Sequence, residues 1–273
     1  MYRRVLTMQD ISCVGQCSTT VALPILSACG LETCILPTVL LSTHTGGFGK
    51  PAVVRFDGTL TDIWRHWQEN GITFDAILVG YLGSLAAVKA AEEIIRRLLA
   101  PGGVAIVDPA MADNGKLYSG FDREYVRAIG TLIEKADVIL PNVTEAAILS
   151  GLPYLENFEK NYVNRLLDGL HHPCAVLTGV DFGDGCTGVV LREAAVQQEY
   201  RHKRIGKGCH GTGDIFAAVF AGALMQGKNR LEAAKIAADF TCRCIENTLS
   251  APAHWYGVKF EPLLPELMEM LGR

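Results

Sequence analysis

Short apolar runs alternate with helical patterns along most of this chain, and this alternation constrains its fold more than any other feature. Residues 76–79 and 104–107 are apolar throughout, and a helical pattern that begins with a capping serine lies between them, at residues 84–99. Strands that are apolar on both faces are typical of parallel sheets covered by helices on both sides. The sequence therefore predicts an α/β fold with a mostly parallel central sheet.

The same alternation extends over the first two thirds of the chain. We expect further strands at residues 4–8, 32–36, 138–140 and 175–177, and further helices at residues 18–29, 60–70, 122–135, 144–150 and 158–170. Because no linker, repeat or low-complexity segment interrupts the pattern, we expect a single domain over residues 1–273.

The pattern changes near the C-terminus. Residues 185–191 and 194–202 resemble the two strands of a hairpin that turns near residues 192–193, which predicts an antiparallel edge of the sheet. Two final helices are expected over residues 230–249 and 262–271.

Composition excludes several classes of protein. Hydrophobic residues make up 49% of the chain and charged residues 20%, and the net charge of −4 offers no basic surface for nucleic acid. No apolar run approaches the roughly 20 residues of a membrane helix, and the N-terminus lacks the apolar core of a signal peptide. The nine cysteines include no Cys-x-x-Cys pair, which argues against disulfides and structural zinc and predicts a cytoplasmic protein.

The strongest functional signal is the glycine-rich loop at residues 206–213, which carries four glycines and precedes an Ala-rich helix. Unpaired N–H groups and the positive end of the helix dipole make such a junction a site for anions. Asp214 follows the loop directly, and a carboxylate there suits a site that deprotonates a hydroxyl beside a phosphate. An ordinary capped helix after a flexible loop is the structural alternative.

Two other glycine motifs in this region are weaker. Residues 206–211 fit the Gly-x-Gly-x-x-Gly pattern of dinucleotide-binding folds, but that pattern opens a βαβ unit, and the chain that follows is almost wholly helical. Residues 222–229 nearly match a phosphate-binding P-loop, but Asn229 stands where Ser or Thr would bind magnesium. Gly227 is more simply explained as a helix C-cap.

Polar residues follow six of the predicted strands. They lie at residues 9–10, 43–47, 80–81, 108–109, 141–142 and 178–179. Turn chemistry alone can place such residues after a strand. In open α/β sheets, however, ligands bind beyond the carboxyl ends of the strands, so six converging ends predict a binding site.

Taken together, these segments resemble the ribokinase-like kinases, and within them the pyridoxal (vitamin B6) kinases. The matching segments are the first strand at 5–10, the His-Thr-Gly loop at 42–46, the tyrosine loop at 80–83, the Asp-Pro segment at 108–118, the Pro-Asn-x-x-Glu-Ala motif at 141–146 and the Gly-Thr-Gly-Asp signature at 211–214. The resemblance covers residues 5 to about 225. It implies a ribokinase-like three-layer α/β/α fold and the phosphorylation of a B6 vitamer by ATP.

The resemblance also implies a role for each matched residue. Asp214 would accept the proton of the substrate's 5′-hydroxymethyl group as that group attacks the γ-phosphate of ATP, while the N–H groups of Gly211, Thr212 and Gly213 bind the nucleotide phosphates and the developing charge. The other implied residues are Asp108 and Glu145 for Mg²⁺, Asn142, Thr178 and Gly179 for the nucleotide, and Asp10, Thr45 and Tyr81 for the pyridine ring. Asp108 and Glu145 could instead be a helix cap and a surface charge. The family also implies a homodimer and leaves room for a monovalent cation.

The chain departs from the family pattern at three points. Asp10 stands where Ser or Thr is usual, so its carboxylate would favour the cationic amine of pyridoxamine, unless it only caps the loop at residues 11–14. Gly47 follows His-Thr-Gly where a Tyr is usual. Residues 209–213 also resemble the hydroxymethylpyrimidine kinases of thiamine synthesis, which often carry Cys at the position of Asp214. Such a kinase, or a non-catalytic nucleotide-binding protein, is therefore the alternative; a sugar kinase would need an additional β lid.

Overall fold

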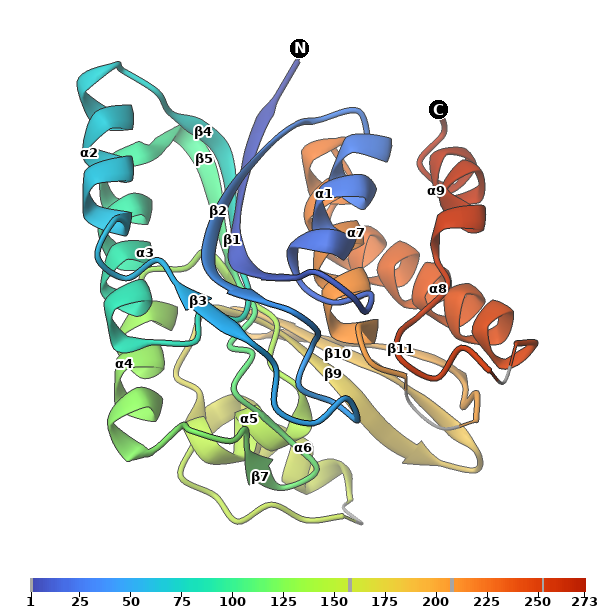
Figure 1. Ribbon diagram of the computed structural model, residues 1–273. Coiled ribbons are helices and arrows are strands. Elements are labelled where there is room, and N and C mark those ends of the chain that lie inside the picture. Colours follow the sequence, from blue (N-terminus) through green and yellow to red (C-terminus); the bar gives the residue numbers. More distant parts are fainter. Residues whose placement is uncertain (1, 157–158, 207–208, 252) are drawn as a thin grey trace.

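The computed structural model describes residues 2–156, 159–206, 209–251 and 253–273. One nine-stranded sheet runs through the molecule in the order β11-β10-β9-β8-β5-β4-β1-β2-β3 (Figure 1). Its strands are β1 (Arg4–Ser12), β2 (Glu32–Leu41), β3 (Val53–Arg55), β4 (Phe74–Val79), β5 (Leu99–Val107), β8 (Val138–Ile139), β9 (Cys174–Gly183), β10 (Cys186–Glu193) and β11 (Val196–Lys203). A separate two-stranded hairpin joins β6 (Ala112–Asp113) to β7 (Lys116–Leu117).

The directions of the strands confirm the predicted sheet. From β2 through β9 every neighbouring pair is parallel, whereas β10 runs antiparallel to both β9 and β11. The short strand β3 adds a second antiparallel edge beside β2, which the sequence pattern did not reveal. The hairpin between β10 and β11 turns at residues 194–195, where Ala194 has a φ of 50°, and not at residues 192–193 as expected.

Helices cover both faces of the sheet. One face carries α1 (Thr19–Ala28), α7 (Thr212–Met225), α8 (Arg230–Leu249) and α9 (Leu264–Met270), the last preceded by a 3-10 turn, η1 (Glu261–Leu263). The other face carries α2 (Leu60–Glu69), α3 (Leu85–Leu98), α4 (Arg123–Ile133), α5 (Val143–Leu149) and α6 (Lys160–Gly169). The start expected for the last of these helices, residue 158, lies outside the described residues. The three-layer α/β/α fold is therefore confirmed.

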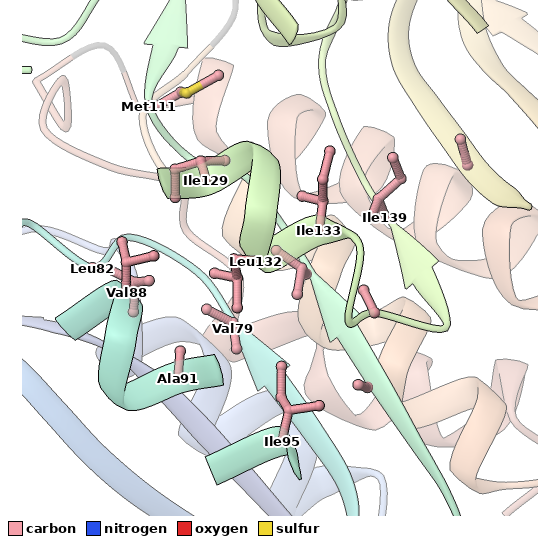
Figure 2. Packing of buried hydrophobic residues seen from close by; sticks show 14 of the residues in the cluster. Val79, Leu82, Val88, Ala91, Ile95, Met111, Ile129, Leu132, Ile133 and Ile139 are labelled. Atoms are coloured by element: carbon pink, nitrogen blue, oxygen red, sulfur yellow. The ribbon is translucent and has the colours of Figure 1, made fainter. Parts of the chain in front are cut away.

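The alternation of side chains along each strand explains why there are two cores. In β4, Ile77 and Val79 join the cluster under α3 and α4, whereas Ala76 and Leu78 join the cluster under α1 and α7. Successive residues of a strand point to opposite faces, so a strand buried on both sides must be apolar at every position. Figure 2 shows the first cluster, in which Val79 lies among side chains from α3 and α4.

The helix α7 is buried around most of its circumference. It packs against α1, α8 and the sheet, and every residue from Ile215 to Ala223 is buried. Its small residues allow the close approach, because a Cβ at Gly222 would overlap the side chain of Cys29. A helix held this firmly fixes the position of its first turn, which carries Asp214. Within the described part of the chain, no helix is both long and apolar enough to cross a bilayer.

Candidate active site

A cavity of about 930 Å³ opens at the carboxyl ends of the parallel strands. It is lined by every residue that the sequence indicated for the site: Asp10, Thr45, Tyr81, Asp108, Asn142, Glu145, Thr178, Gly179, Gly211, Thr212, Gly213 and Asp214. A smaller cavity of about 470 Å³ lies at the opposite ends of the strands, near Arg3 and Asp75. The larger cavity contains the predicted carboxylates Asp108, Glu145 and Asp214 together with the glycine loop, and it is therefore the candidate site.

Two of the polar segments lie inside strands and not after them, which corrects the sequence prediction. Strand β1 continues to Ser12 because it pairs with β2 beyond the end of β4, so Asp10 belongs to the strand. Thr178 and Gly179 likewise lie within β9, which continues past the parallel part of the sheet to pair with β10. Both long strands therefore form walls of the cavity beyond the edge of the parallel core.

The loop before α7 depends on glycine at residue 211. Gly211 has a φ of 89°, and a Cβ at this position would overlap the carbonyl oxygen of Gln16. Its own carbonyl accepts the first helical hydrogen bond, from the N–H of Ile215 at 3.0 Å. The N–H groups of the first turn consequently face the cavity with the positive end of the helix dipole, as an anion site requires. Residues 207–208 of the predicted glycine loop lie outside the described residues.

Three carboxylates gather around this helix start. A Cβ at Gly213 would lie 4.0 Å from Oδ2 of Asp108, so the Asp108 carboxylate faces the first turn of α7. Burial raises the pKa of Asp108, and the neighbouring carboxylates of Glu145 and Asp214 raise it further. Burial also raises the pKa of Asp214 to about 7, against the lowering effect of a hydrogen bond from the Ser18 backbone. Such a cluster favours a bound proton or a bound cation.

Glu145 has two functions in the local structure. Its Oε2 accepts from the N–H of Asn142 at 2.9 Å while Asn142 Oδ1 accepts from the N–H of Glu145 at 2.9 Å, so the two residues form a capping box at the start of α5. Its Oε1 accepts from the N–H of Met111 at 3.1 Å. Glu145 therefore does cap a helix, as the alternative interpretation proposed, but the same buried carboxylate also lines the cavity. Burial raises its pKa to about 7.

One end of the cavity is formed by β1 and the loop after β2. Asp10 is 3% exposed, and its Oδ2 accepts a hydrogen bond from the hydroxyl of Ser12 at 2.9 Å. Burial raises the pKa of Asp10, while the hydroxyl groups of Ser18 and Ser12 lower it. These partners are hydroxyl groups on either side of the loop at residues 13–17, and not the N–H groups of residues 11–14 that the capping alternative invoked.

Sequence reasoning missed the far end of the cavity. Beyond Thr178 the cavity continues between the antiparallel strands and α8, where its walls are His202, Arg204, Ile205, Thr241, Cys242 and Ile245. Cys242 Sγ lies 3.1 Å from Nδ1 of His202. No motif in the sequence indicates these residues, because residues 194–202 and 230–249 show only the patterns of a hairpin strand and of a helix.

A C-terminal aromatic segment was also missed. Trp255 and Tyr256 lie 4.7 and 5.8 Å from Phe48, between ring centroids, and so reach the loop at residues 42–48. Three aromatic residues in succession, 254–256, were the available signal, but the family resemblance ends near residue 225.

Comparison with known proteins identifies relatives of this fold and site. The phosphomethylpyrimidine kinase family model matches residues 63–258. The crystal structure of pyridoxal kinase from Lactobacillus plantarum is 34% identical, with a TM-score of 0.90, over 99% of this chain and 98% of that one. A pyridoxine/pyridoxal/pyridoxamine kinase from Bordetella bronchiseptica is 28% identical over 90% of each chain.

A more distant structure has the same fold. Pyridoxal kinase from Leishmania donovani, solved with ADP and pyridoxamine, is 22% identical with a TM-score of 0.87 over 97% of this chain and 95% of that one. The family model covers more than half of the chain, and the Lactobacillus structure matches it almost from end to end. The chain therefore belongs to the phosphomethylpyrimidine kinase family and, within the ribokinase-like superfamily, to the pyridoxal kinases.

Proposed function

We propose that this protein transfers the γ-phosphate of ATP to the 5′-hydroxymethyl group of a vitamin B6 vitamer: pyridoxal, pyridoxine or pyridoxamine. The observation that carries the proposal is the position of Asp214 in the first turn of α7, with glycine N–H groups beside it and Asp108 facing it. Phosphoryl transfer needs little else from a protein than positioned donors and a group that takes the proton of the nucleophile.

Asp214 is the proposed general base. It would take the proton of the 5′-hydroxyl while the hydroxyl oxygen forms a bond to the γ-phosphorus and the bond to the β-γ bridging oxygen breaks, leaving ADP. A pKa of about 7 suits this role, because a base works best when its pKa lies near the working pH. The N–H groups of Gly211, Thr212 and Gly213 would stabilise the charge that grows on the phosphate oxygens.

Asp108 and Glu145 fit a magnesium site. They are neighbouring carboxylates that line the cavity, and carboxylate oxygen is the ligand that Mg²⁺ prefers in proteins. Among the described residues, no group of three or more His, Cys, Asp and Glu is arranged to hold a metal. Mg²⁺ usually keeps several waters and takes only one or two carboxylates from the protein, and a bound ion would neutralise charge on the phosphate oxygens.

The shape of the cavity supports a division between nucleotide and vitamer. We assign the nucleotide to the side of Asn142, Thr178 and Gly179, continuing toward α8, and the pyridine ring to the side of Asp10, Thr45 and Tyr81. A volume of about 930 Å³ lies at the upper end of the range for ligand pockets, which suits two substrates. The Leishmania relative was solved with ADP and pyridoxamine together, which agrees with binding of two substrates.

The remaining proposals concern the setting of the protein. We infer a homodimer from the family alone. We place the protein in the cytoplasm, because Cys29, Cys174 and Cys244 are buried as free thiols, the usual state of cysteine in a reducing compartment. Titration of the activity with potassium and sodium tests whether the protein needs a monovalent cation.

One second candidate has specific support. The family model that matches residues 63–258 is described as phosphomethylpyrimidine kinase, so hydroxymethylpyrimidine is the alternative substrate. A sugar kinase is disfavoured because the only additional sheet in the described residues, β6-β7, is too short to form a lid.

The test is an ADP-release assay on the purified protein with Mg-ATP and each of four alcohols: pyridoxal, pyridoxine, pyridoxamine and hydroxymethylpyrimidine. We expect the highest kcat/KM with a B6 vitamer and formation of its 5′-phosphate. A higher kcat/KM with hydroxymethylpyrimidine would move the protein to the alternative. No turnover with any of the four would reject both.

A further inference from the structure

His44 occupies the point where four segments of the chain meet. The segments are the loop after β1 (residues 13–17), the loop after β2 (residues 42–48), the loop before α7 (residues 209–211) and a C-terminal segment (residues 253–257). The His44 side chain is only 5% exposed, although it belongs to a loop and lines the cavity.

The hydrogen bonds of His44 fix its protonation. The N–H of Gly46 donates to Nδ1 at 3.0 Å, so Nδ1 carries no proton. Nε2 therefore carries the proton and donates to the carbonyl oxygen of Tyr256 at 2.6 Å. The imidazole is thus neutral with its proton on Nε2, and burial lowers the pKa of His44 in agreement with this state. One side chain joins the turn around Thr45 to the C-terminal segment.

Packing around the ring leaves little freedom. The ring centroid lies 4.9 Å from that of His210 and 5.0 Å from that of Phe48. A Cβ at Gly15 would overlap the imidazole, and a Cβ at Gly46 would overlap the ring of His210. Gly15 therefore allows the loop after β1 to close on His44, and Gly46 allows the loop after β2 to close on His210.

The C-terminal segment makes a second contact with the same loop. A Cβ at Gly47 would lie 2.6 Å from Cζ3 of Trp255, so the absence of a side chain at residue 47 makes room for the indole. Trp255 also packs on Phe48, with 4.7 Å between ring centroids. Segment 253–257 is therefore joined to loop 42–48 by a hydrogen bond and by aromatic packing.

We propose that His44 is a positioning residue for the B6 vitamer: by tying the turn around Thr45 to segment 253–257, it holds the substrate side of the cavity in its binding shape. This inference rests on the proposed function. It extends the site to a C-terminal segment that follows the last recognised motif by about 40 residues. It also makes a directional prediction, because both side-chain hydrogen bonds of His44 join residues of the vitamer side, Gly46 and Tyr256, and neither joins a residue assigned to the nucleotide.

The test compares two substitutions at residue 44. His44→Phe keeps an aromatic ring but removes both hydrogen bonds. His44→Gln retains an amide N–H that can reach the Tyr256 carbonyl. We expect the KM for the vitamer to rise about 2- to 12-fold in His44→Phe, the range for loss of one net hydrogen bond. His44→Gln should recover part of that loss, and the KM for ATP should change little in either variant.

Two further measurements separate positioning from a general loss of stability. Kinetics are recorded well below the melting temperature of the weaker variant, with His66→Phe and His66→Gln, on the exposed face of α2, as matched controls. Hydrogen exchange of a peptide covering residues 42–48 should be faster in His44→Phe than in wild type. An equal rise in both KM values, or an unchanged vitamer KM, would overturn the proposal.

The outcomes also distinguish this inference from the proposed function. If the wild-type protein phosphorylates no vitamer, the proposed function is rejected. The hydrogen-exchange experiment still tests His44 in that case, because unchanged exchange of residues 42–48 in His44→Phe would show that His44 does not hold this loop in place. If wild type is active and the variants behave as wild type does, only the role of His44 is rejected.

Discussion

The residue with the clearest chemical assignment is Asp214. It is held by a buried helix, its pKa is raised to about 7, and it lies beside the N–H groups that would bind phosphate. Asp10 departs from the family pattern at the end of the cavity where we propose that the vitamer binds, and a buried carboxylate there is unusual without a cation or a set of donors. Two hydroxyl groups supply part of that set, and the amine of a substrate could supply more.

Asp214→Asn should reduce kcat by about 10²- to 10⁴-fold, because the amide keeps the shape of the side chain but cannot take the proton. Binding of ATP should be largely retained, since the N–H groups of the helix start are unchanged. Steady-state kinetics with pyridoxal and calorimetric titration with ATP measure the two effects. A variant that keeps most of the wild-type kcat would exclude Asp214 as the base.

Asp10→Ser should reduce any preference for pyridoxamine over pyridoxal by roughly 10-fold or more, the effect expected for loss of a hydrogen bond to a charged group. The measurement is the ratio of kcat/KM values for the two vitamers in wild type and variant, together with melting curves. If Asp10 only ties Ser12 to Ser18, the melting temperature should fall while the ratio stays the same. That result would remove Asp10 from substrate selection.

At the scale of elements, the start of α7 and the capping box of α5 show how backbone geometry builds the site. Gly211 allows the chain to turn against Gln16 and enter the helix, and Asn142 and Glu145 close the start of α5 while lining the cavity. In both places, residues at the start of a helix also line the cavity. A change that weakens the cap should therefore also weaken the function.

Gly211→Ala tests this coupling, with Gly227→Ala at the other end of α7 as the matched control. Both glycines have positive φ, 89° and 86°, but a Cβ at Gly211 would overlap the Gln16 carbonyl, whereas a Cβ at Gly227 has nothing within 4 Å. Gly227→Ala should cost about 1–2 kcal/mol of stability for the left-handed backbone and leave kcat unchanged. Gly211→Ala should cost more and should also reduce kcat.

Denaturant unfolding and steady-state kinetics on both variants provide the comparison. Equal losses of stability with normal kcat in both proteins would mean that the contact of Gly211 with Gln16 is not needed to place Asp214.

At the scale of the whole molecule, the buried carboxylates should make stability depend on pH. The pKa of Asp214 is raised in the folded protein, so between its ordinary pKa and about 7 the folded state binds a proton that the unfolded state has lost. Stability contributed in this way is present at low pH and is lost as pH rises toward 7 and beyond. Ligand-free wild type should therefore lose stability between pH 5 and pH 8.

The contribution of Asp214 is the difference between wild type and Asp214→Asn. The Asn variant should lose less stability over the same range of pH, because it has no carboxyl group to titrate at that position. Urea unfolding of both proteins at several pH values measures this. An identical pH dependence would show that the pKa of Asp214 is not raised in the folded protein.

The sequence by itself determined the layered α/β architecture and the glycine loop before α7, for a physical reason, whereas the family resemblance supplied most of the twelve predicted site residues, all of which line the cavity. Strand segments buried on both faces must be apolar throughout, as residues 76–79 of β4 and 105–107 of β5 are, and a glycine loop before a helix must place its N–H groups outward. Such signals are local, so they can be read from one stretch at a time. The roles given to those residues remain predictions, because a position in the wall of a cavity does not by itself establish a catalytic or binding role.

Only the tertiary structure decided which distant segments complete the cavity. Three features depend on residues that come together only when the chain folds. They are the edge strand β3, the hydrogen bonds of Glu145 to both Asn142 and Met111, and the hydrogen bond between His44 and Tyr256. His44 and Tyr256 are 212 positions apart, and no local pattern of either stretch specifies that contact. Chain topology brings the C-terminal segment back over the loop after β2, and side-chain packing then determines which groups touch.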